Sequence, residues 1–309
     1  MTNGPLTPVS ASDDFSDMER SLRRPRSLFS WAMSVLTGTM TFAALVPLIS
    51  VLYLLITRGG KMLGLAAFSE LPPAALAPGG GFGNAIVGTV VMVAIAAAIS
   101  VPFGILAAIF IAEFDADSRT AAAVRFCAKV LTGLPSILAG VFAFAAVVVL
   151  TGGFSAPAGG IALAVLMLPT VLLTAEEAIK RVPPKMREAA IGMGATPTQV
   201  VLRVVLPTAL PGVATGVMLA VARAAGETAP LLFTALFSDY WISRTSPEFL
   251  PKTLGELMKP TASLAVLIYN FSGSPFDNQI DLAWAAALVL VAIVLIVNVA
   301  GRALARRVG

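Results

Sequence analysis

Residues 84–112 read NAIVGTVVMVAIAAAISVPFGILAAIFIA, a run from Asn84 to Ala112 without one charged side chain. Such a run exceeds the roughly 20 apolar residues that cross a bilayer as a helix. The whole chain shares this imbalance, with 57% hydrophobic and 12% charged residues. Ordinary globular domains have about 45–50% apolar and about 25% charged residues. The chain is therefore predicted to be a polytopic membrane protein.

Charge-poor windows predict the remaining membrane spans. They lie at Trp31–Thr57, Val130–Gly153, Phe154–Ala175, Thr208–Phe237 and Leu282–Gly301. The apolar segment Ala262–Phe271 is too short to cross a bilayer, and we expect a re-entrant or interfacial helix there. The first 27 residues are rich in Ser, Pro, Asp and Arg and are expected to form a disordered tail. We therefore expect an all-α membrane protein with six transmembrane helices, whose membrane domain spans residues 28–309.

The distribution of basic residues predicts the orientation, because cytoplasmic loops carry an excess of Lys and Arg. One side would hold Arg20, Arg23, Arg24, Arg26, Arg119, Arg125, Lys129, Lys180, Arg181, Lys185, Arg187, Arg203, Arg302, Arg306 and Arg307. The other side would hold Arg58, Lys61, Arg244, Lys252 and Lys259. Both termini and segment 180–211 are therefore expected in the cytoplasm, and segment 238–281 in the periplasm.

Composition excludes several kinds of chemistry. The chain has no histidine and one cysteine, Cys127, so His-based triads, zinc clusters and His-ligated haem lack their ligands or bases. No lysine lies in a phosphate-binding loop motif, so the chain does not hydrolyse ATP by that route. Basic residues flank apolar spans rather than forming a patch with aromatics, which argues against a nucleic-acid partner. We expect a non-catalytic protein without cofactor or metal.

Segment 180–211 is predicted to form a helical hairpin. Pro183 and Pro184 can start a helix, and Gly194 can supply a left-handed C-terminal cap. Thr196 and Gln199 have the spacing of a capping box, which predicts a second short helix. Leu206–Pro207 is expected to break that helix before the fifth span.

The spacing of this hairpin resembles the EAA loop of binding-protein-dependent ABC importer permeases. The matching residues are Glu188, Ala189, Ala190, Gly194, Leu206 and Pro207, with Val204 in place of the usual isoleucine. The resemblance implies a type I ABC importer permease fold, and it implies that the hairpin docks on a cytoplasmic ATPase. Alternatively, the hairpin only links two spans, and Glu188 is a solvated carboxylate near a helix start.

Two charges are expected within the fifth span. Arg223 and Glu227 lie four residues apart and would share one helix face in mid-membrane. Charges at that depth are costly, so the pair should face a watery cavity or the bundle interior. A substrate-pathway site, with Arg223 holding an oxyanion, and a purely structural ion pair both fit this position.

Two interpretations also fit the charges at the end of the fourth span. Glu176, Glu177, Lys180 and Arg181 are expected to be interfacial charges, with a gating role as the alternative. The motif Gly133–Leu134–Pro135–Ser136 is expected to kink the third span.

Longer strings resemble the PstA-type permeases of phosphate importers. These strings are RAAGETAPLLFTA at 223–235, LLTAEEAIKRVP at 172–183 and SLAVLIYN at 263–270. The resemblance implies inorganic phosphate as substrate, and a place in the bacterial inner membrane. The implied partners are a PstC-like permease in a heterodimer, a PstB-like ATPase dimer and a PstS-like periplasmic phosphate-binding protein. Sulfate, molybdate or phosphonate remain alternative substrates, and a secondary transporter or channel remains an alternative class.

Overall fold

A computed structural model of the chain describes residues 25–242 and 254–308, and these residues form helices without any strand. The chain divides into two compact units, Met1–Leu54 and Leu55–Gly309. The described part of the first unit is helix α1 (Pro25–Leu54), so helix begins within the segment expected to be a disordered tail. Residues 1–24 of that tail lie outside the described residues.

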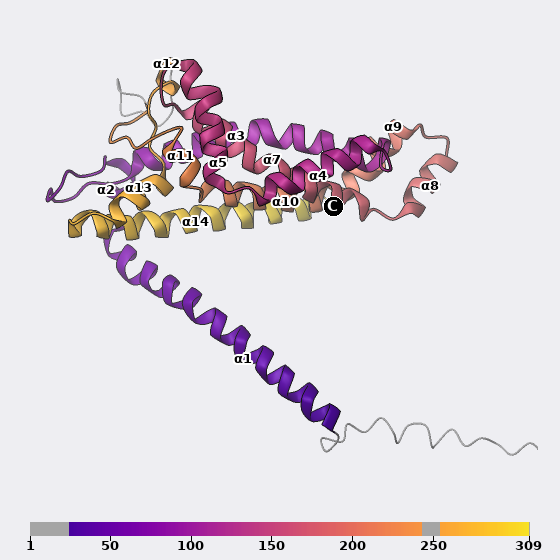
Figure 1. Cartoon of the computed structure of the whole chain (residues 1–309), viewed down its shortest axis with the longest axis horizontal. Helices are drawn as coiled ribbons and strands as arrows, with labels where there is room; N and C mark the ends of the chain where they lie inside the picture. The colour runs from indigo at the N-terminus through magenta and orange to yellow at the C-terminus, as the bar shows by residue number, and fades with distance from the viewer. Residues whose placement is uncertain (1–24, 243–253, 309) are drawn as a thin grey trace, which may run out of the picture. The chain divides into compact units, whose positions relative to one another are not determined.

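The second unit is a bundle of long helices with short helices at both ends (Figure 1). Its first half contains η2 (Leu55–Gly59), η3 (Gly60–Met62), α2 (Leu65–Ser69), α3 (Gly83–Ile109), η4 (Phe110–Phe114), α4 (Arg119–Gly133), α5 (Ser136–Ala143), η5 (Phe144–Val148) and α6 (Val149–Thr151). Its second half contains α7 (Ala156–Lys180), α8 (Pro184–Gly192), α9 (Pro197–Val200), η6 (Val201–Val205), α10 (Leu206–Ala225), α11 (Ala229–Leu232), α12 (Leu254–Leu257), α13 (Leu264–Ser272) and α14 (Asp277–Val308). The segments η2, η4, η5 and η6 are π-helical turns, and η3 is a 3₁₀ turn.

Five helical segments of the described chain are long and apolar enough to cross a membrane, or six if one bent pair counts as a span. They are Leu28–Met62, Gly83–Phe114, Ala156–Lys180, Pro197–Ala225 and Asp277–Ala303, and the bent pair is Arg119–Gly133 with Ser136–Thr151. The expectation of an all-α membrane protein is therefore confirmed for the described residues, and six spans are reached when the bent pair counts as one.

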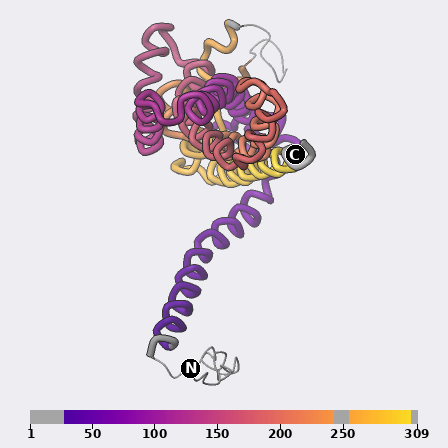
Figure 2. Tube along the Cα trace, turned by 90° about the vertical axis from the view of Figure 1, so that its right-hand side faces the viewer, coloured from indigo at the N-terminus to yellow at the C-terminus, as the bar shows by residue number. Residues whose placement is uncertain are grey.

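Helix α7 is the centre of the bundle. In its most apolar window 67% of the residues are buried, against 28% or less in each of the other candidate spans. Small residues make this possible, because they let neighbouring helices approach closely. Gly159 and Gly160 face Met92 and Ile95 of α3, while Thr174 faces Gly216 of α10. In Figure 2 the α8 and α9 end faces the viewer, and the long helices of this unit lie side by side.

The third span is bent far more sharply than a kink. Helices α4 and α5 meet at 104°, so the expected continuous span Val130–Gly153 is wrong at its start. Leu134 has an extended backbone (φ −69°, ψ 138°), as expected for a residue that precedes proline, and Pro135 is extended as well. The apolar part of this bent pair is therefore Ser136–Thr151, and the basic helix α4 leaves it nearly at a right angle.

The fifth span also differs from expectation at both ends. Its helix begins at Pro197 and ends at Ala225, rather than running from Thr208 to Phe237. Gly226 caps the C-terminus, with its N–H donating to the carbonyl of Arg223 at 3.1 Å. Pro230 then lies in the first turn of the separate helix α11, where proline is tolerated.

The short apolar segment before the last span forms α13, which is too short to cross a bilayer, as expected. Its residues Leu264, Val266 and Leu267 are buried within the second unit. The N–H of Leu264 donates to the hydroxyl of Thr89 in α3 at 2.9 Å. This backbone N–H at the start of α13 has no partner within its own helix, so a neighbouring span supplies its hydrogen-bond acceptor. Interior packing of this kind fits a re-entrant helix better than an interfacial one.

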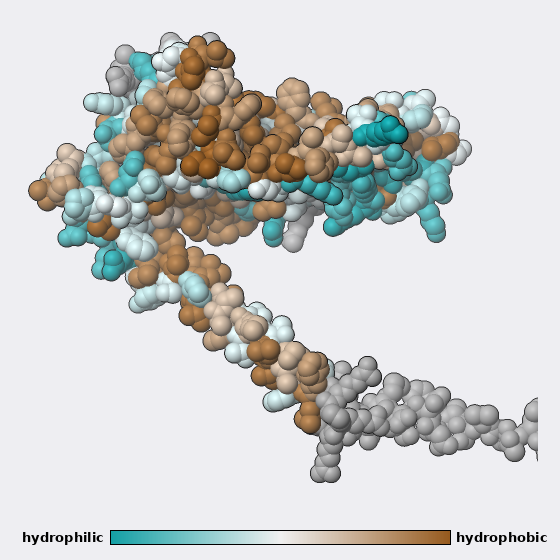
Figure 3. Space-filling view, viewed as in Figure 1, coloured by the Kyte–Doolittle hydropathy of each residue, from teal (hydrophilic) through white to brown (hydrophobic). Residues whose placement is uncertain are grey.

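Hydrophobic side chains cover much of the length of the second unit, while hydrophilic ones gather at its ends (Figure 3). The end with α8 and α9 carries the last turn of α7 and the C-terminal part of α14 (Figure 1). The basic residues assigned to the cytoplasm from Arg119 onward belong to elements at this end. We call it the hairpin end of the bundle.

Candidate functional site

The hairpin is built from two capped helices, as its sequence predicts. Helix α8 ends at Gly192, and Gly194 follows with φ of +87°, a conformation that glycine adopts without steric cost. The N–H of Ala195 donates to the carbonyl of Ala190 at 3.1 Å, which closes a Schellman-type turn. Both bonds of the capping box between Thr196 and Gln199 are present. The two caps fix the turn between α8 and α9.

The residues of the EAA pattern divide into two groups. Glu188, Ala189, Gly194 and Pro207 are exposed, and Leu206 is half-buried. Ala190 is buried in a core cluster with Val200 and Val205, so it packs the hairpin against the span ends. The exposed face also carries apolar side chains that the motif does not include. Ile191, Met193 and Leu202 are 58%, 83% and 57% exposed, which is typical of a surface that a partner covers.

The expected helix break at Leu206–Pro207 is absent. The helix runs from Pro197 to Ala225, and the π-helical turn Val201–Val205 lies directly before Leu206–Pro207. A proline ring clashes with the carbonyl four residues earlier in an α-helix. The wider turn instead directs the N–H of Leu206 to the carbonyl of Val201, and the hydroxyl of Thr208 donates to Val204 at 2.6 Å. The hairpin is therefore continuous with the fifth span.

An ion pair attaches α8 to the ends of two spans. Arg187 Nη2 lies 2.6 Å from Glu113 Oε1, and Arg187 Nε lies 3.3 Å from Glu113 Oε2. The same guanidinium donates to the carbonyl oxygens of Val182 at 2.5 Å and Ile179 at 3.0 Å. The Arg187 and Glu113 side chains are 22% and 11% exposed, so water screens this pair poorly. The hairpin is thus bound to η4, which continues α3, and to the C-terminal end of α7.

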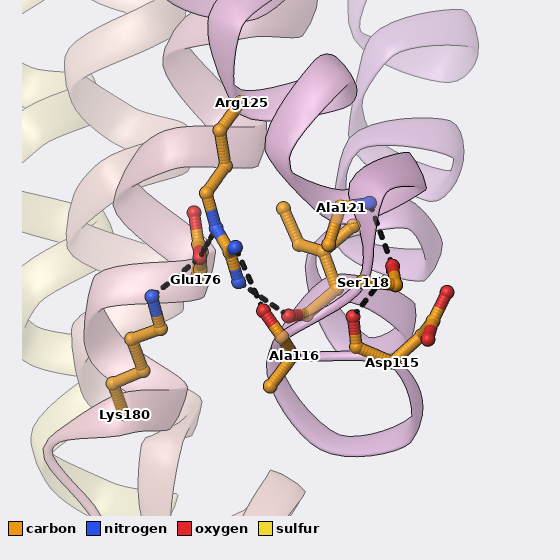
Figure 4. A network of polar contacts seen from close by, with 8 residues as sticks. Asp115, Ala116, Ser118, Ala121, Arg125, Glu176 and Lys180 are labelled. Atoms are coloured by element: carbon orange, nitrogen blue, oxygen red, sulfur yellow. Dashed lines mark hydrogen bonds and ion pairs between the residues drawn. The ribbon is translucent and has the colours of Figure 1, made fainter.

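A second network of ion pairs and hydrogen bonds joins α4 to the end of α7 (Figure 4). Glu176 of α7 accepts from Arg125 Nε of α4 at 2.5 Å and from Lys180 Nζ at 2.6 Å. Arg125 also donates to the carbonyl oxygens of Ala116 and Ile111 at 2.9 and 2.7 Å. The Glu176 side chain is only 7% exposed, so this residue is not the interfacial charge that its position suggests. Glu177 and Arg181 are exposed and do fit that description.

The sequence gives a local signal for the pair of Glu176 with Lys180, which lie four residues apart on α7, but none for the pairs that join different helices. Arg187 and Glu113 are 74 residues apart, and Arg125 and Glu176 are 51 residues apart. Which charges pair depends on the packing of α3, α4 and α7.

Arg223 and Glu227 are close but not arranged as expected. Arg223 lies in the last turn of α10, while Glu227 lies beyond the helix end. Arg223 Nε and Glu227 Oε1 are 3.6 Å apart, and the two side chains are 42% and 17% exposed. The expectation of two charges on one helix face in mid-span is wrong, because Gly226 ends the helix between them. The exposed guanidinium keeps donors available for a ligand.

Comparisons with known proteins agree with this architecture. Residues 100–309 match the family model described as "binding-protein-dependent transport system inner membrane component". The phosphate transport system permease protein PstA of Yersinia pestis is 37% identical over 92% of this chain and 91% of its own length. The probable PstA of Methanocaldococcus jannaschii is 33% identical over 85% of this chain and 89% of its own length.

Solved structures share the fold. A chain of a bacterial alginate ABC transporter superposes with a TM-score of 0.62 at 15% identity, covering 93% of this chain and 98% of its own. A chain of the inward-facing MetNI methionine ABC transporter superposes with a TM-score of 0.56 at 22% identity, covering 73% of this chain and 93% of its own. With its apolar spans and this ABC importer permease fold, the chain is a multi-pass inner-membrane protein. It belongs to the family of binding-protein-dependent transport permeases, within the group formed by its PstA relatives.

Proposed function

We propose that this chain is the transmembrane permease subunit of an ATP-driven importer of inorganic phosphate. The observation that carries the proposal is the 37% identity to a phosphate transport permease over 92% of this chain. The helical bundle with a capped hairpin at one end supports it. Such a subunit forms the translocation path with a second, PstC-like permease, and a PstB-like ATPase dimer supplies the energy. A PstS-like binding protein delivers phosphate to segment 238–281.

Uptake of ³²P-labelled phosphate tests this function. A strain that lacks this gene is expected to lose high-affinity uptake and to regain it from a plasmid copy. Excess unlabelled sulfate, molybdate or phosphonate should leave the uptake unchanged. Competition by one of these oxyanions would instead assign that substrate, and uptake that continues after ATP depletion would favour a secondary transporter or channel.

The coupling role belongs to the hairpin, with Glu188, Ala189, Gly194, Leu206 and Pro207 at or near the surface that meets the ATPase. Ala190 acts beneath that surface, where it packs α8 onto the span ends. The exposed apolar side chains Ile191, Met193 and Leu202 extend the same face.

Gly194→Val is expected to uncouple ATP hydrolysis from uptake without preventing membrane insertion. A Cβ at this position meets no atom within 4 Å, so the cost lies in the backbone, whose φ of +87° disfavours a β-branched residue. Gly192→Val is the matched control, because Gly192 lies in the same hairpin, has open space and lacks a positive φ. The measurement is ATPase activity against ³²P-phosphate uptake in vesicles. Normal uptake by Gly194→Val would refute the role of this turn.

Orientation is testable by thiol labelling in a Cys127→Ser background. We propose that the hairpin end faces the cytoplasm, because the basic residues are concentrated there. A cysteine at Thr198 in α9 should resist an impermeant maleimide in intact spheroplasts. A cysteine at Leu76, which is 79% exposed in the loop before α3, should react. The opposite pattern would reverse the topology.

A further inference from the structure

A cavity of about 870 Å³ opens between α4, α7 and α10 at the hairpin end of the bundle. Its size lies within the range of small-molecule sites. Close packing of α7 and α10 along one wall depends on glycine, since Gly212 faces Ala178 and Gly216 faces Thr174. The cavity extends from apolar residues such as Leu173 and Leu219 to charged residues at the end of α7.

The charged lining is predominantly positive. Its cations are Arg125, Lys129, Lys180 and Arg181, and its anions are Glu176 and Glu177. Two positive charges are therefore in excess. This excess lies toward the hairpin end of the cavity, where an anionic group is favoured over a neutral one.

Three of the cations retain unused hydrogen-bond donors. Lys180 uses one of its three donors on Glu176, and Arg181 makes one contact, with Glu177 at 3.3 Å. Lys129 makes no ion pair with any residue that the structure describes. Arg125, by contrast, is already held by Glu176 and two carbonyl oxygens.

The hydroxyl groups of the cavity offer no competing donors. Thr174, Thr208 and Thr215 each donate to a carbonyl oxygen one turn earlier in their own helix, at 2.7, 2.6 and 2.8 Å. An anion in the cavity would therefore be held by ammonium and guanidinium groups. Such a donor set suits a phosphate group, whose several oxygens can each accept a charge-assisted hydrogen bond.

We propose that this cavity binds a phosphate group through Lys129, Lys180 and Arg181. Two sources supply that chemistry, inorganic phosphate on the hairpin side and the headgroup of an anionic phospholipid. The first source rests on the proposed transport function, and the second does not. Arg125 and Glu176 position Lys180, because Glu176 joins the two cations.

The test uses the full chain purified with its co-expressed partner subunits. Equilibrium binding of ³²P-orthophosphate in detergent forms one arm. Retention of phosphatidylglycerol from nanodiscs of equal phosphatidylglycerol and phosphatidylcholine, measured by native mass spectrometry, forms the other. The variant is Lys129→Gln with Arg181→Gln. The control is Arg119→Gln with Arg302→Gln, which removes the same charge from exposed residues that do not line the cavity.

We expect the cavity variant to weaken one of the two ligands by roughly tenfold or more, because two cations near the ligand are lost. The control should change neither ligand by more than about twofold. If the cavity variant binds less orthophosphate, the ligand of the cavity is free phosphate. If it retains less phosphatidylglycerol, the ligand is the lipid headgroup. A Lys129→Arg, Arg181→Lys swap keeps both charges and should retain binding, which separates a lost site from a misfolded protein.

Equal behaviour of the cavity variant and the control in both arms would overturn the proposal. Phosphate uptake by the wild-type complex is measured in a separate assay, which tests the proposed function independently of the cavity. A wild type that imports no phosphate would remove the proposed function and the free-phosphate source, while selective loss of phosphatidylglycerol would still support the site.

Discussion

In an Arg187→Met variant, ATP hydrolysis by the assembled importer is expected to continue while phosphate uptake falls by about tenfold or more. Arg187 is the side chain that joins the hairpin to Glu113 in η4, which continues α3, and to two carbonyl oxygens at the end of α7. A movement imposed on α8 by the ATPase can reach both spans through these bonds. Without them α8 remains attached through its core packing alone.

The same variant should also lower stability by about 3 kcal/mol, since it leaves the Glu113 carboxylate 11% exposed and without its partner. Thermal unfolding of the purified complex measures this loss. Lys185→Met is the matched control, because Lys185 lies in the same helix, is exposed and makes no ion pair with a described residue. It should change neither stability nor uptake.

A double variant separates coupling from stability. Glu113→Gln with Arg187→Met removes both charges, so much of the lost stability should return. Uptake should stay low, because the bonds between α8 and the spans are still missing. If the double variant imports phosphate at the wild-type rate, the ion pair contributes to folding and not to coupling.

Arg223→Gln is expected to reduce phosphate uptake roughly a hundredfold, since a lost charge-assisted contact to an anion costs up to about 3 kcal/mol. The Arg223 side chain is 42% exposed, and its 3.6 Å separation from Glu227 is longer than a good hydrogen bond. Its donors are therefore largely available to an oxyanion. Lysine at this position should rescue only part of the uptake, because it keeps the charge but lacks the planar fork.

The decisive measurement is uptake by Arg223→Gln combined with Glu227→Gln. If the two residues only brace the bundle, removing both charges should restore near-normal transport. If Arg223 contacts the substrate, uptake should stay low although the partner subunits still co-purify. Near-normal uptake by the double variant would therefore show that Arg223 is not part of the substrate pathway.

Local chemistry predicted much of the fold. Charge-free runs placed most of the spans, because a bilayer imposes length and apolarity on each helix. Gly194, Thr196 and Gln199 act within one or two turns of the backbone, so their caps followed directly from spacing. The length of Ala262–Phe271 predicted a helix that does not span, and the packing of α13 then favoured a re-entrant over an interfacial helix.

Predictions failed where the outcome depends on packing or on a competing backbone geometry. Proline at 207 normally ends a helix, but the π-helical turn before it absorbs the clash. Gly226 ends α10 early, so helical spacing placed Glu227 wrongly. The ion pair of Arg187 with Glu113 forms only when three helices pack together, and the spacing of residues in the sequence does not predict that contact.

The π-helical turn at Val201–Val205 has a consequence for the history of this family. A π turn holds one residue more than the α turn it replaces, which makes it equivalent to a single-residue insertion. A homologue without proline at position 207 has no need of that extra residue. Across homologues, the distance from the capping threonine to the glycine that ends α10 should therefore vary by one residue in step with that proline, and alignment gaps should fall between positions 201 and 205.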